Sequence, residues 1–231
     1  MNSDSTNGTL PPVARLPLPT TSRGTRTRAA LAAAARQVFE RDGFLDARIV
    51  DIAAQAGVAT GSFYTYFEGK EEAFAAVMAE VQEEMLHPRL VPLADHDDPV
   101  AVIEAANRAY LISYRRNAKL MGLMEEVAQI DESFRRQRLQ RTRAFAMRNA
   151  HAIRRLQQDG LADRSLDAQL AALALGAMVS RMAYVRFVQG YGSASTDVLV
   201  QTVTRLWANA LGITPKKKEI RRDGLRTQRS L

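Results

Sequence analysis

Residues 49–67 read IVDIAAQAGVATGSFYTYF, and no other segment says more about the fold. Ala53 is small enough for two helices to cross closely at that point. Four residues later, Gly57 suits a left-handed turn, a conformation that residues with a Cβ atom disfavour. Phe63, six residues further on, is placed to fill the angle between the two helices. The segment therefore predicts a short helix, a glycine turn and a second short helix, which is the layout of a helix-turn-helix.

The second helix of this segment has an inward and an outward face. Phe63 and Phe67 lie one helical turn apart and are predicted core residues, and Ile52 and Val58 complete their contact. The residues left to the outward face are Thr60, Gly61, Tyr64 and Thr65. A short helix with such a face fits the major groove of duplex DNA.

Apolar residues recur at helical spacing on both sides of this segment. The earlier series is Leu31, Ala35, Val38 and Phe39, and the later one is Phe74, Val77, Met78, Val81 and Met85. Asp42-Gly43 is predicted to stop the first helix, and His87-Pro88 the second. Beyond residue 98 the sequence again has helical spacing, and strand alternation is not apparent. The helices predicted there are 99–117, 118–130, 132–158, 167–189 and 196–211, with Asp167 as a capping residue.

The composition limits the class of protein. Of the 231 residues, 46% are apolar and 25% are charged, which suits a soluble globular chain of one or two domains. The longest apolar run has about ten residues, too short for a membrane helix, and we expect no membrane association. The absence of cysteine excludes disulfides and fits a cytoplasmic protein. The net charge of +7 lies mostly after residue 213, where seven basic residues stand against two acidic ones.

A family resemblance follows from these residues. The pairs Gly43-Phe44 and Lys70-Glu71, the triplet Asp51-Ile52-Ala53 and the run 56–67 together resemble the DNA-binding domain of TetR-family transcriptional regulators. The strong resemblance covers about residues 26–81. It implies a homodimer with an N-terminal three-helix helix-turn-helix domain and a variable C-terminal helical domain that binds a small molecule and dimerises. In such proteins the usual outcome is repression of a palindromic operator that the ligand relieves.

The resemblance assigns roles within the DNA-binding domain. Thr60, Gly61 and Thr65 are candidates for contact with base edges, and Tyr64, Tyr66 and Lys70 for contact with phosphates. The full set of predicted DNA-binding residues is Arg48, Thr60, Gly61, Ser62, Tyr64, Thr65, Tyr66 and Lys70. The tyrosines have a second interpretation as packing residues, and Lys70 as a solvated lysine at a helix start.

Two departures from the family pattern concern helix caps. The family often has Thr or Ser at the positions of Ala47 and Arg48, and Ser at the position of Ala59. A missing hydroxyl cap typically costs about 1 kcal/mol. We expect slightly weaker helix starts at both places, offset by Arg48 if it meets a phosphate, or by Asp46 if it substitutes as a cap.

The chain thus divides into four predicted parts within an all-α fold. These are a disordered arm (1–22), the helix-turn-helix domain (23–69), the effector-binding and dimerisation domain (70–213) and a basic disordered tail (214–231). Candidate dimer residues on the last helix step by four, three and four: Leu199, Val203, Leu206 and Ala210. Candidate effector residues are Tyr110, Tyr114, Met121, Met124, Phe145, Met147, Met178 and Met182, chosen because methionine and aromatic side chains repack around an apolar guest. Either set has the alternative of forming ordinary core.

Other functions have less support. The three histidines are scattered, and neither a phosphate loop nor a nucleophile motif occurs, so we expect no catalytic residue, metal or cofactor. A helical enzyme with a structural N-terminal hairpin is one alternative. A second is a sequence-blind DNA coater that acts through the basic tail. The eight arginines between Arg135 and Arg155 suggest either an anion site or a solvated helix face.

Overall fold

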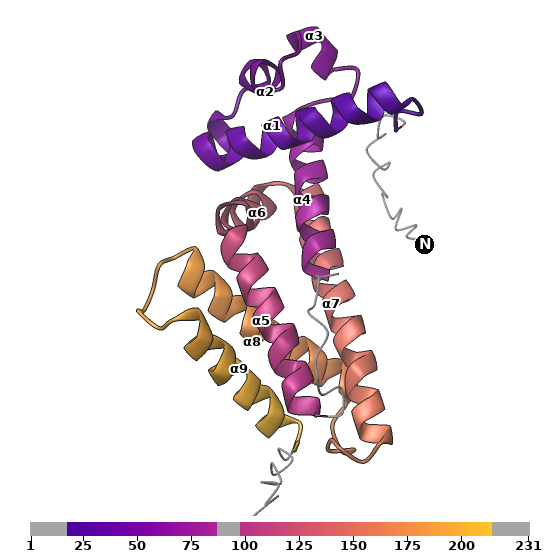
Figure 1. Ribbon diagram of the computed structural model, residues 1–231, viewed down its shortest axis with the longest axis vertical. Helices are drawn as coiled ribbons and strands as arrows, with labels where there is room; N and C mark the ends of the chain where they lie inside the picture. Colours follow the sequence, from indigo (N-terminus) through magenta and orange to yellow (C-terminus); the bar gives the residue numbers. More distant parts are fainter. Residues whose placement is uncertain (1–17, 87–97, 214–231) are drawn as a thin grey trace, which may run out of the picture. The chain divides into compact units, whose positions relative to one another are not determined.

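The computed structural model describes residues 18–86 and 98–213, and every regular element in these two ranges is a helix. The helices are α1 (Ser22–Asp46), α2 (Ile49–Gln55), α3 (Thr60–Phe63), α4 (Lys70–Leu86), α5 (Pro99–Arg116), α6 (Ala118–Ile130), α7 (Glu132–Gln158), α8 (Ala168–Phe187) and α9 (Thr196–Ala210) (Figure 1). The predicted all-α class is confirmed. The predicted bounds of α6 and α7 agree with the structure, and α5, α8 and α9 end one or two residues earlier than predicted.

Side-chain caps explain several of the helix starts. Asp167 precedes α8, and its carboxylate accepts a hydrogen bond from the Leu170 amide at 2.7 Å, which confirms its predicted role. Ser195 caps α9 in the same way through the Val198 amide at 3.3 Å. Thr21 caps α1 through the Gly24 amide, so the start of this helix lies within residues 1–22, the predicted disordered arm. Most of that arm (1–17) and the tail (214–231) lie outside the described residues.

The end of α1 differs from the prediction. The helix does not stop at Asp42-Gly43 but continues to Asp46, with a break at Gly43, where φ is 81° and ψ is 177°. These angles are open in practice only to glycine. Gly43 therefore kinks the chain without ending the helical segment, and the final turn changes direction before α2 begins.

One compact unit contains α1 to α4, α6 and the first turns of α7, that is, residues 18–86 and 117–139. Its core includes a cluster of four phenylalanines. The ring of Phe74 (α4) lies 5.1 Å from Phe39 and 5.2 Å from Phe44 (both α1), measured between centroids, and 5.4 Å from Phe134 (α7). This cluster joins α1 to α4 and fixes the helix from which the helix-turn-helix departs.

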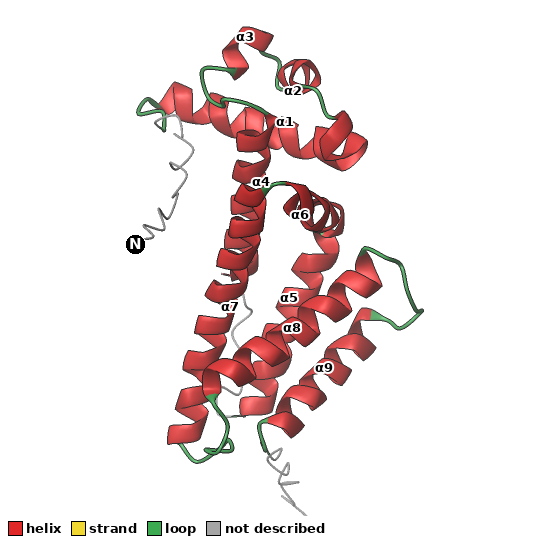
Figure 2. Cartoon of the chain, turned by 180° about the vertical axis from the view of Figure 1, so that it is seen from behind, coloured by secondary structure: helices red, strands yellow, loops and turns green. Residues whose placement is uncertain are grey.

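A second compact unit contains α5, the rest of α7, α8 and α9, that is, residues 98–116 and 140–213. Helix α9 runs antiparallel to α5 (Figure 2). At one end Arg115 donates to the Thr196 hydroxyl at 3.1 Å, and further along the buried Asn107 amide donates to the buried Thr204 hydroxyl at 3.2 Å. The functional division at residues 69 and 70 remains a prediction, because these units are defined by packing alone.

Helix α8 bears on the expectation that the protein does not associate with a membrane. By length and composition, this one helix among the described residues is apolar enough to cross a membrane, although no unbroken apolar run in it reaches that length. Only 22% of its apolar window is buried within the chain. Core helices of soluble proteins pass the same test, so the helix is weak support for a membrane span. Its exposed apolar side chains still need a partner surface.

Candidate nucleic-acid interface

The turn between α2 and α3 has the geometry that the sequence predicts. Gly57 adopts a φ of 69°, and a Cβ atom built there would meet no atom within 4 Å. The Val58 amide donates to the Ala53 carbonyl at 3.0 Å and the Gly57 amide to the Ala54 carbonyl at 3.1 Å. This pair of bonds is a Schellman motif, which ends a helix with a left-handed residue. Gly57 is therefore required by its backbone conformation and not by lack of space.

The inner face of the helix-turn-helix is fully buried. Ile52, Ala53, Phe63 and Phe67 have no exposed surface, and the rings of Phe63 and Phe67 lie 5.5 Å apart. The predicted core role of both phenylalanines is confirmed. Arg28 of α1 covers this core, because its guanidinium lies 4.7 Å above the Phe67 ring.

The opposite face of α3 is open to solvent. Thr60, Gly61, Tyr64 and Thr65 are exposed, whereas Ser62 and Tyr66 are half-buried. Tyr64 exposes 53% of its surface and makes an edge-to-face contact with the Phe63 ring at 5.6 Å. It thus packs with one edge and leaves its remaining surface free. The structure brings all the predicted base-contact candidates together on one short helix and the turn that follows it.

The two helix starts lack side-chain caps, as predicted. Ala59 occupies the N-cap position of α3 and Arg48 that of α2, and neither side chain accepts a cap hydrogen bond. Asp46 is not a substitute cap, because it is the last residue of α1 and stands two positions before the N-cap. That expectation was wrong because α1 extends beyond Gly43.

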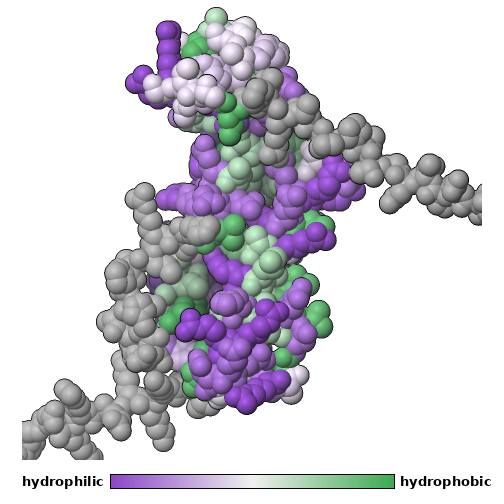
Figure 3. Space-filling model, turned by 90° about the vertical axis from the view of Figure 1, so that its right-hand side faces the viewer, coloured by the Kyte–Doolittle hydropathy of each residue, from purple (hydrophilic) through white to green (hydrophobic). Residues whose placement is uncertain are grey.

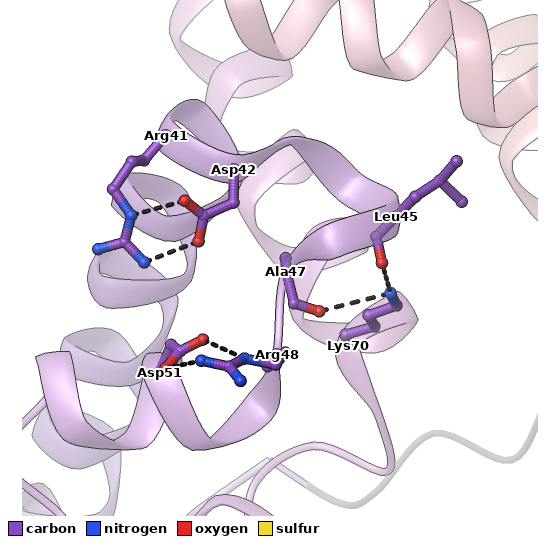
Figure 4. A network of polar contacts seen from close by, with 7 residues as sticks. All are labelled: Arg41, Asp42, Leu45, Ala47, Arg48, Asp51 and Lys70. Carbon is purple, nitrogen blue, oxygen red and sulfur yellow. Dashed lines mark hydrogen bonds and ion pairs between the residues drawn. The ribbon is translucent and has the colours of Figure 1, made fainter.

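The Arg48 guanidinium makes a two-pronged ion pair with Asp51. Its Nε lies 2.8 Å from Oδ2 and its Nη2 3.1 Å from Oδ1, and 72% of the Arg48 side chain is exposed (Figure 4). The hydrogen bond that Arg48 donates to Asp51, and then the negative charge of Asp51, raise the pKa of Arg48. A second pair, Arg41 with Asp42, lies beside it with distances of 2.6 and 2.7 Å. The Asp51 carboxylate therefore neutralises the positive charge of Arg48, one of the predicted DNA-binding residues.

The half-buried Lys70 contacts the main chain. Its ammonium donates to the carbonyl oxygens of Leu45 at 2.8 Å, Phe44 at 3.0 Å and Ala47 at 3.4 Å, and lies 5.0 Å from the Phe44 ring centre (Figure 4). These carbonyls belong to the last turn of α1 and the link to α2. Lys70 is half-buried and has these main-chain partners, while the predicted phosphate contact stays a prediction.

Carboxylates also occupy the start of α4. Glu71 and Glu72 lie in its first turn, and the Glu72 carboxylate accepts a hydrogen bond from the Glu68 amide at 2.8 Å. Negative side chains at this end of a helix satisfy its free amides. These carboxylates therefore make the start of α4 less favourable for a phosphate.

The effector candidates are divided between the two compact units. Met121 and Met124 are buried in the unit that contains the helix-turn-helix, and the other six belong to the second unit. There, the Tyr110 ring lies 5.5 Å from Phe145 and 5.9 Å from Tyr114, and Tyr114 lies 6.4 Å from Phe187. Met178 is half-buried, but Met147 exposes 69% of its surface and Met182 is also exposed. The aromatic chain thus joins α5 to α7 and α8.

The dimer candidates on α9 separate into two groups. Leu199 and Val203 are buried within the chain, whereas Leu206 and Ala210 are exposed. Helix α8 exposes further apolar side chains, among them Leu170 (67% exposed) and Leu173 (44%). Helix α8 and the outer face of α9 therefore both carry exposed apolar side chains.

The arginines of α7 mostly form a solvated surface. Arg143, Arg154 and Arg155 are exposed, and the view that faces α7 is largely hydrophilic over this part of the chain (Figure 3). Arg138 pairs with Glu125 at 2.7 Å, and Arg135 pairs with Glu132. Among the described residues, no group of three His, Asp or Glu side chains is placed to hold a metal ion.

Comparison with known proteins agrees with this geometry. Residues 31–77 match the sequence model of the bacterial regulatory proteins of the tetR family. The transcriptional regulator YdgC of Bacillus subtilis, of the helix-turn-helix type, is 39% identical over 59 residues. That match spans 26% of this chain and 30% of YdgC, so it concerns less than a third of the relative.

Solved structures extend the likeness to most of the chain. The fatty acid degradation regulator FadR of Bacillus halodurans is 18% identical with a TM-score of 0.66, over 79% of this chain and 98% of FadR. SmeT of Stenotrophomonas maltophilia, the repressor of the multidrug efflux pump SmeDEF, is 21% identical with a TM-score of 0.64, over 82% and 94%. A transcriptional regulator of Rhodococcus sp. Rha1 is 20% identical with a TM-score of 0.64, over 81% and 99%. At these identities the likeness concerns the fold.

The α2–turn–α3 segment with its exposed α3 face is a helix-turn-helix, and the relative YdgC that matches it is a transcriptional regulator. Over residues 31–77 the chain matches the tetR family of bacterial regulatory proteins, and this match covers its N-terminal domain alone.

Proposed function

We propose that the chain binds duplex DNA sequence-specifically by placing α3 in the major groove. The observation that carries this proposal is the division of α3: Phe63 and Phe67 are buried, while Thr60, Gly61 and Thr65 are exposed. Threonine contacts the thymine methyl group or a hydrogen-bond acceptor of a base, and glycine lets the backbone approach closely. These three residues would therefore read bases, as the family resemblance implies.

Contacts to the DNA backbone would come from residues around this face. Tyr64 and the half-buried Ser62 and Tyr66 have hydroxyl groups suited to phosphate oxygens, and Arg48 contributes a guanidinium. Such contacts fix the position of the protein on DNA without reading its sequence. Lys70 supports the interface by holding the end of α1, given its three carbonyl contacts.

The active form is proposed to be a homodimer. Leu170, Leu173 and Leu206 are large apolar side chains that the single chain leaves exposed on α8 and α9. Exposed apolar surface of this extent marks an interaction site, and helix pairs from two copies would bury it in a four-helix contact. A two-fold dimer presents two α3 helices to a palindromic operator. Leu199 and Val203, buried in the monomer, would support this surface from within.

The second unit is proposed to bind a small, mostly apolar effector that releases the DNA. Tyr110 and Tyr114 of α5 and Phe145 of α7 supply an aromatic surface. Met178, another effector candidate, lies on α8. Binding there would favour a spacing of the two α3 helices that no longer matches successive major grooves. A coupling of about 1–3 kcal/mol changes DNA affinity by roughly 5- to 150-fold. The regulator would then be a cytoplasmic repressor.

Selection of bound fragments from a random duplex pool tests this function. The expected result is a palindromic consensus, whose half-sites lie a whole number of helical turns apart. The chain cut after Ile213 is the control for the alternative of a basic-tail coater, because that alternative loses all binding when the tail is removed. Recovery of no consensus, or a binding activity that disappears with the tail, would contradict the proposal.

A further inference from the structure

Four charged side chains alternate in sign where α1 ends and α2 begins. Arg41 pairs with Asp42, and Arg48 pairs with Asp51, each guanidinium facing both oxygens of its carboxylate (Figure 4). The charges also act across the pairs: Asp42 acts on Arg48, and Asp51 acts on Arg41. The corner therefore has two guanidinium groups but little net charge.

Arg48 occupies a position from which it can meet the DNA backbone. It is the N-cap residue of α2, and the first helix of a helix-turn-helix crosses the DNA backbone. Its side chain is 72% exposed, so water and solute ions reach it. Exposed ion pairs contribute little to stability and exchange readily. A phosphate can therefore replace the carboxylate as the partner of this guanidinium.

The replacement has a cost in DNA affinity. While Asp51 holds Arg48, the pair offers no net charge to DNA, and a phosphate that takes the guanidinium leaves the Asp51 carboxylate unpaired beside other negative charges. Each neutralised phosphate normally releases a counterion and strengthens binding. An arginine that is already paired with a carboxylate adds much less to the DNA affinity.

We propose that Asp51 limits the DNA affinity of this protein by competing with the phosphate backbone for Arg48. This inference rests on the DNA-binding function proposed above and adds a residue that restrains it. The effect would be largest on non-specific DNA, where phosphate contacts supply essentially all of the binding. A restrained backbone contact leaves a larger share of the affinity to Thr60, Gly61 and Thr65, and so raises the preference for the operator over other sequences.

The test compares Asp51→Asn, Arg48→Gln, the double variant and the wild type. The dissociation constants for a duplex of arbitrary sequence and for the selected operator are measured by fluorescence anisotropy over a range of salt. Asp51→Asn is expected to tighten binding to the arbitrary duplex about three- to eightfold at 0.1 M salt, and to steepen the salt dependence by about one counterion. Arg48→Gln is expected to weaken binding.

Asp42→Asn is the matched control, because it removes the same charge from the same corner without releasing Arg48. It should tighten binding much less than Asp51→Asn does. In the Arg48→Gln background, Asp51→Asn should have only the small effect of the control. Equal effects of the two Asp→Asn changes, or an undiminished effect without Arg48, would overturn the inference, because they would indicate a general charge effect.

Folding and function are separated in the same set of proteins. Asp51 lies in the first turn of α2, where a carboxylate stabilises the helix, so thermal unfolding of every variant is recorded. If Asp51→Asn is unfolded, Arg48→Lys replaces it, because lysine keeps the charge but cannot make two parallel hydrogen bonds to Asp51. Failure of all proteins to bind any duplex contradicts the proposed function. Binding by the wild type without a gain in these variants contradicts the restraint alone.

Discussion

The ammonium group of Lys70 donates a hydrogen bond to the carbonyl oxygen of Leu45 at 2.8 Å, across 25 residues of sequence. This bond and its neighbour to Phe44 join the first residue of α4 to the last turn of α1. Carbonyl groups at the end of a helix lack partners within it, and a cation placed there compensates for them. Lys70 thus helps fix the direction in which the chain leaves α1 toward α2.

Replacement of Lys70 by methionine is expected to lower the free energy of unfolding by roughly 1–3 kcal/mol, because the carbonyl groups lose a charged donor. The salt dependence of DNA binding should stay unchanged if the lysine only supports the fold. A decrease of the salt slope by about one would instead assign Lys70 to a phosphate. Lys119→Met is the control, since Lys119 makes one longer bond of 3.3 Å from an exposed position to the Glu40 carbonyl.

Gly57→Ala is expected to destabilise the protein by about 1–2 kcal/mol and to weaken DNA binding. The cause is the φ of 69°, since a Cβ atom at this position meets no neighbour. Gly61→Ala is the matched change, because Gly61 also has free space but a helical conformation. It should leave denaturant-induced unfolding unchanged or shift it to slightly higher denaturant, while it alters the choice of base. A larger loss of stability at Gly61 than at Gly57 would contradict this explanation.

Thr65→Ala is expected to cost about 1–3 kcal/mol at one operator position and nothing at the others. Thr65→Ser keeps the hydroxyl and removes the methyl group, whereas Thr65→Val does the reverse. Affinities of the three variants for operators changed one base pair at a time separate the two kinds of contact. Uniform weakening on all sequences would assign Thr65 to the DNA backbone.

Leu170→Glu is expected to convert the dimer into a monomer without unfolding the chain, because 67% of this side chain is exposed. Val203→Ala should have the opposite effect, with a loss of about 1–3 kcal/mol of stability and an unchanged dimer, because Val203 is fully buried within the chain. Sedimentation velocity and thermal unfolding measure the two properties. A wild type that stays monomeric at all concentrations would rule out the proposed assembly.

Thr204→Val is expected to lower stability by roughly 1–3 kcal/mol, because it removes the Thr204 hydroxyl that accepts a hydrogen bond from the buried Asn107 amide at 3.2 Å. Asn107→Leu combined with Thr204→Val should recover part of that loss, since both polar groups are then gone. Denaturant unfolding of the single and double variants completes a double-mutant cycle. Additive effects would show that the two side chains do not depend on each other.

The parts of the fold that depend on neighbouring residues could be predicted from the sequence. Gly57 and the buried Phe63 and Phe67 follow from spacing within a single turn, and the Asp167 cap follows from its place before an apolar series. The interruption of α1 at Gly43 was predicted, but the further turn to Asp46 was not, because the Phe44 contacts that keep this turn in place are tertiary.

The side-chain contacts of the candidate site were harder to predict from the sequence. The Lys70 contacts join residues more than 20 positions apart, and spacing within one helix carries no signal of them. The Arg48–Asp51 pair did have a local signal, since opposite charges three residues apart face each other at a helix start. On α9, the regular spacing of Leu199, Val203 and Leu206 could not say which of them face α5, because that depends on the packing of a distant segment.

The kink at Gly43 bears on how genetic screens of this protein would be interpreted. Any other residue at position 43 would resist the required backbone angles, although the Leu123 side chain leaves ordinary space for a Cβ atom at 4.0 Å. Loss-of-function alleles should therefore accumulate at codon 43 alongside those of the operator-contacting helix. A map of inactivating alleles would then include a position outside the proposed DNA-contacting face, and assays of purified protein would be needed to tell the two groups apart.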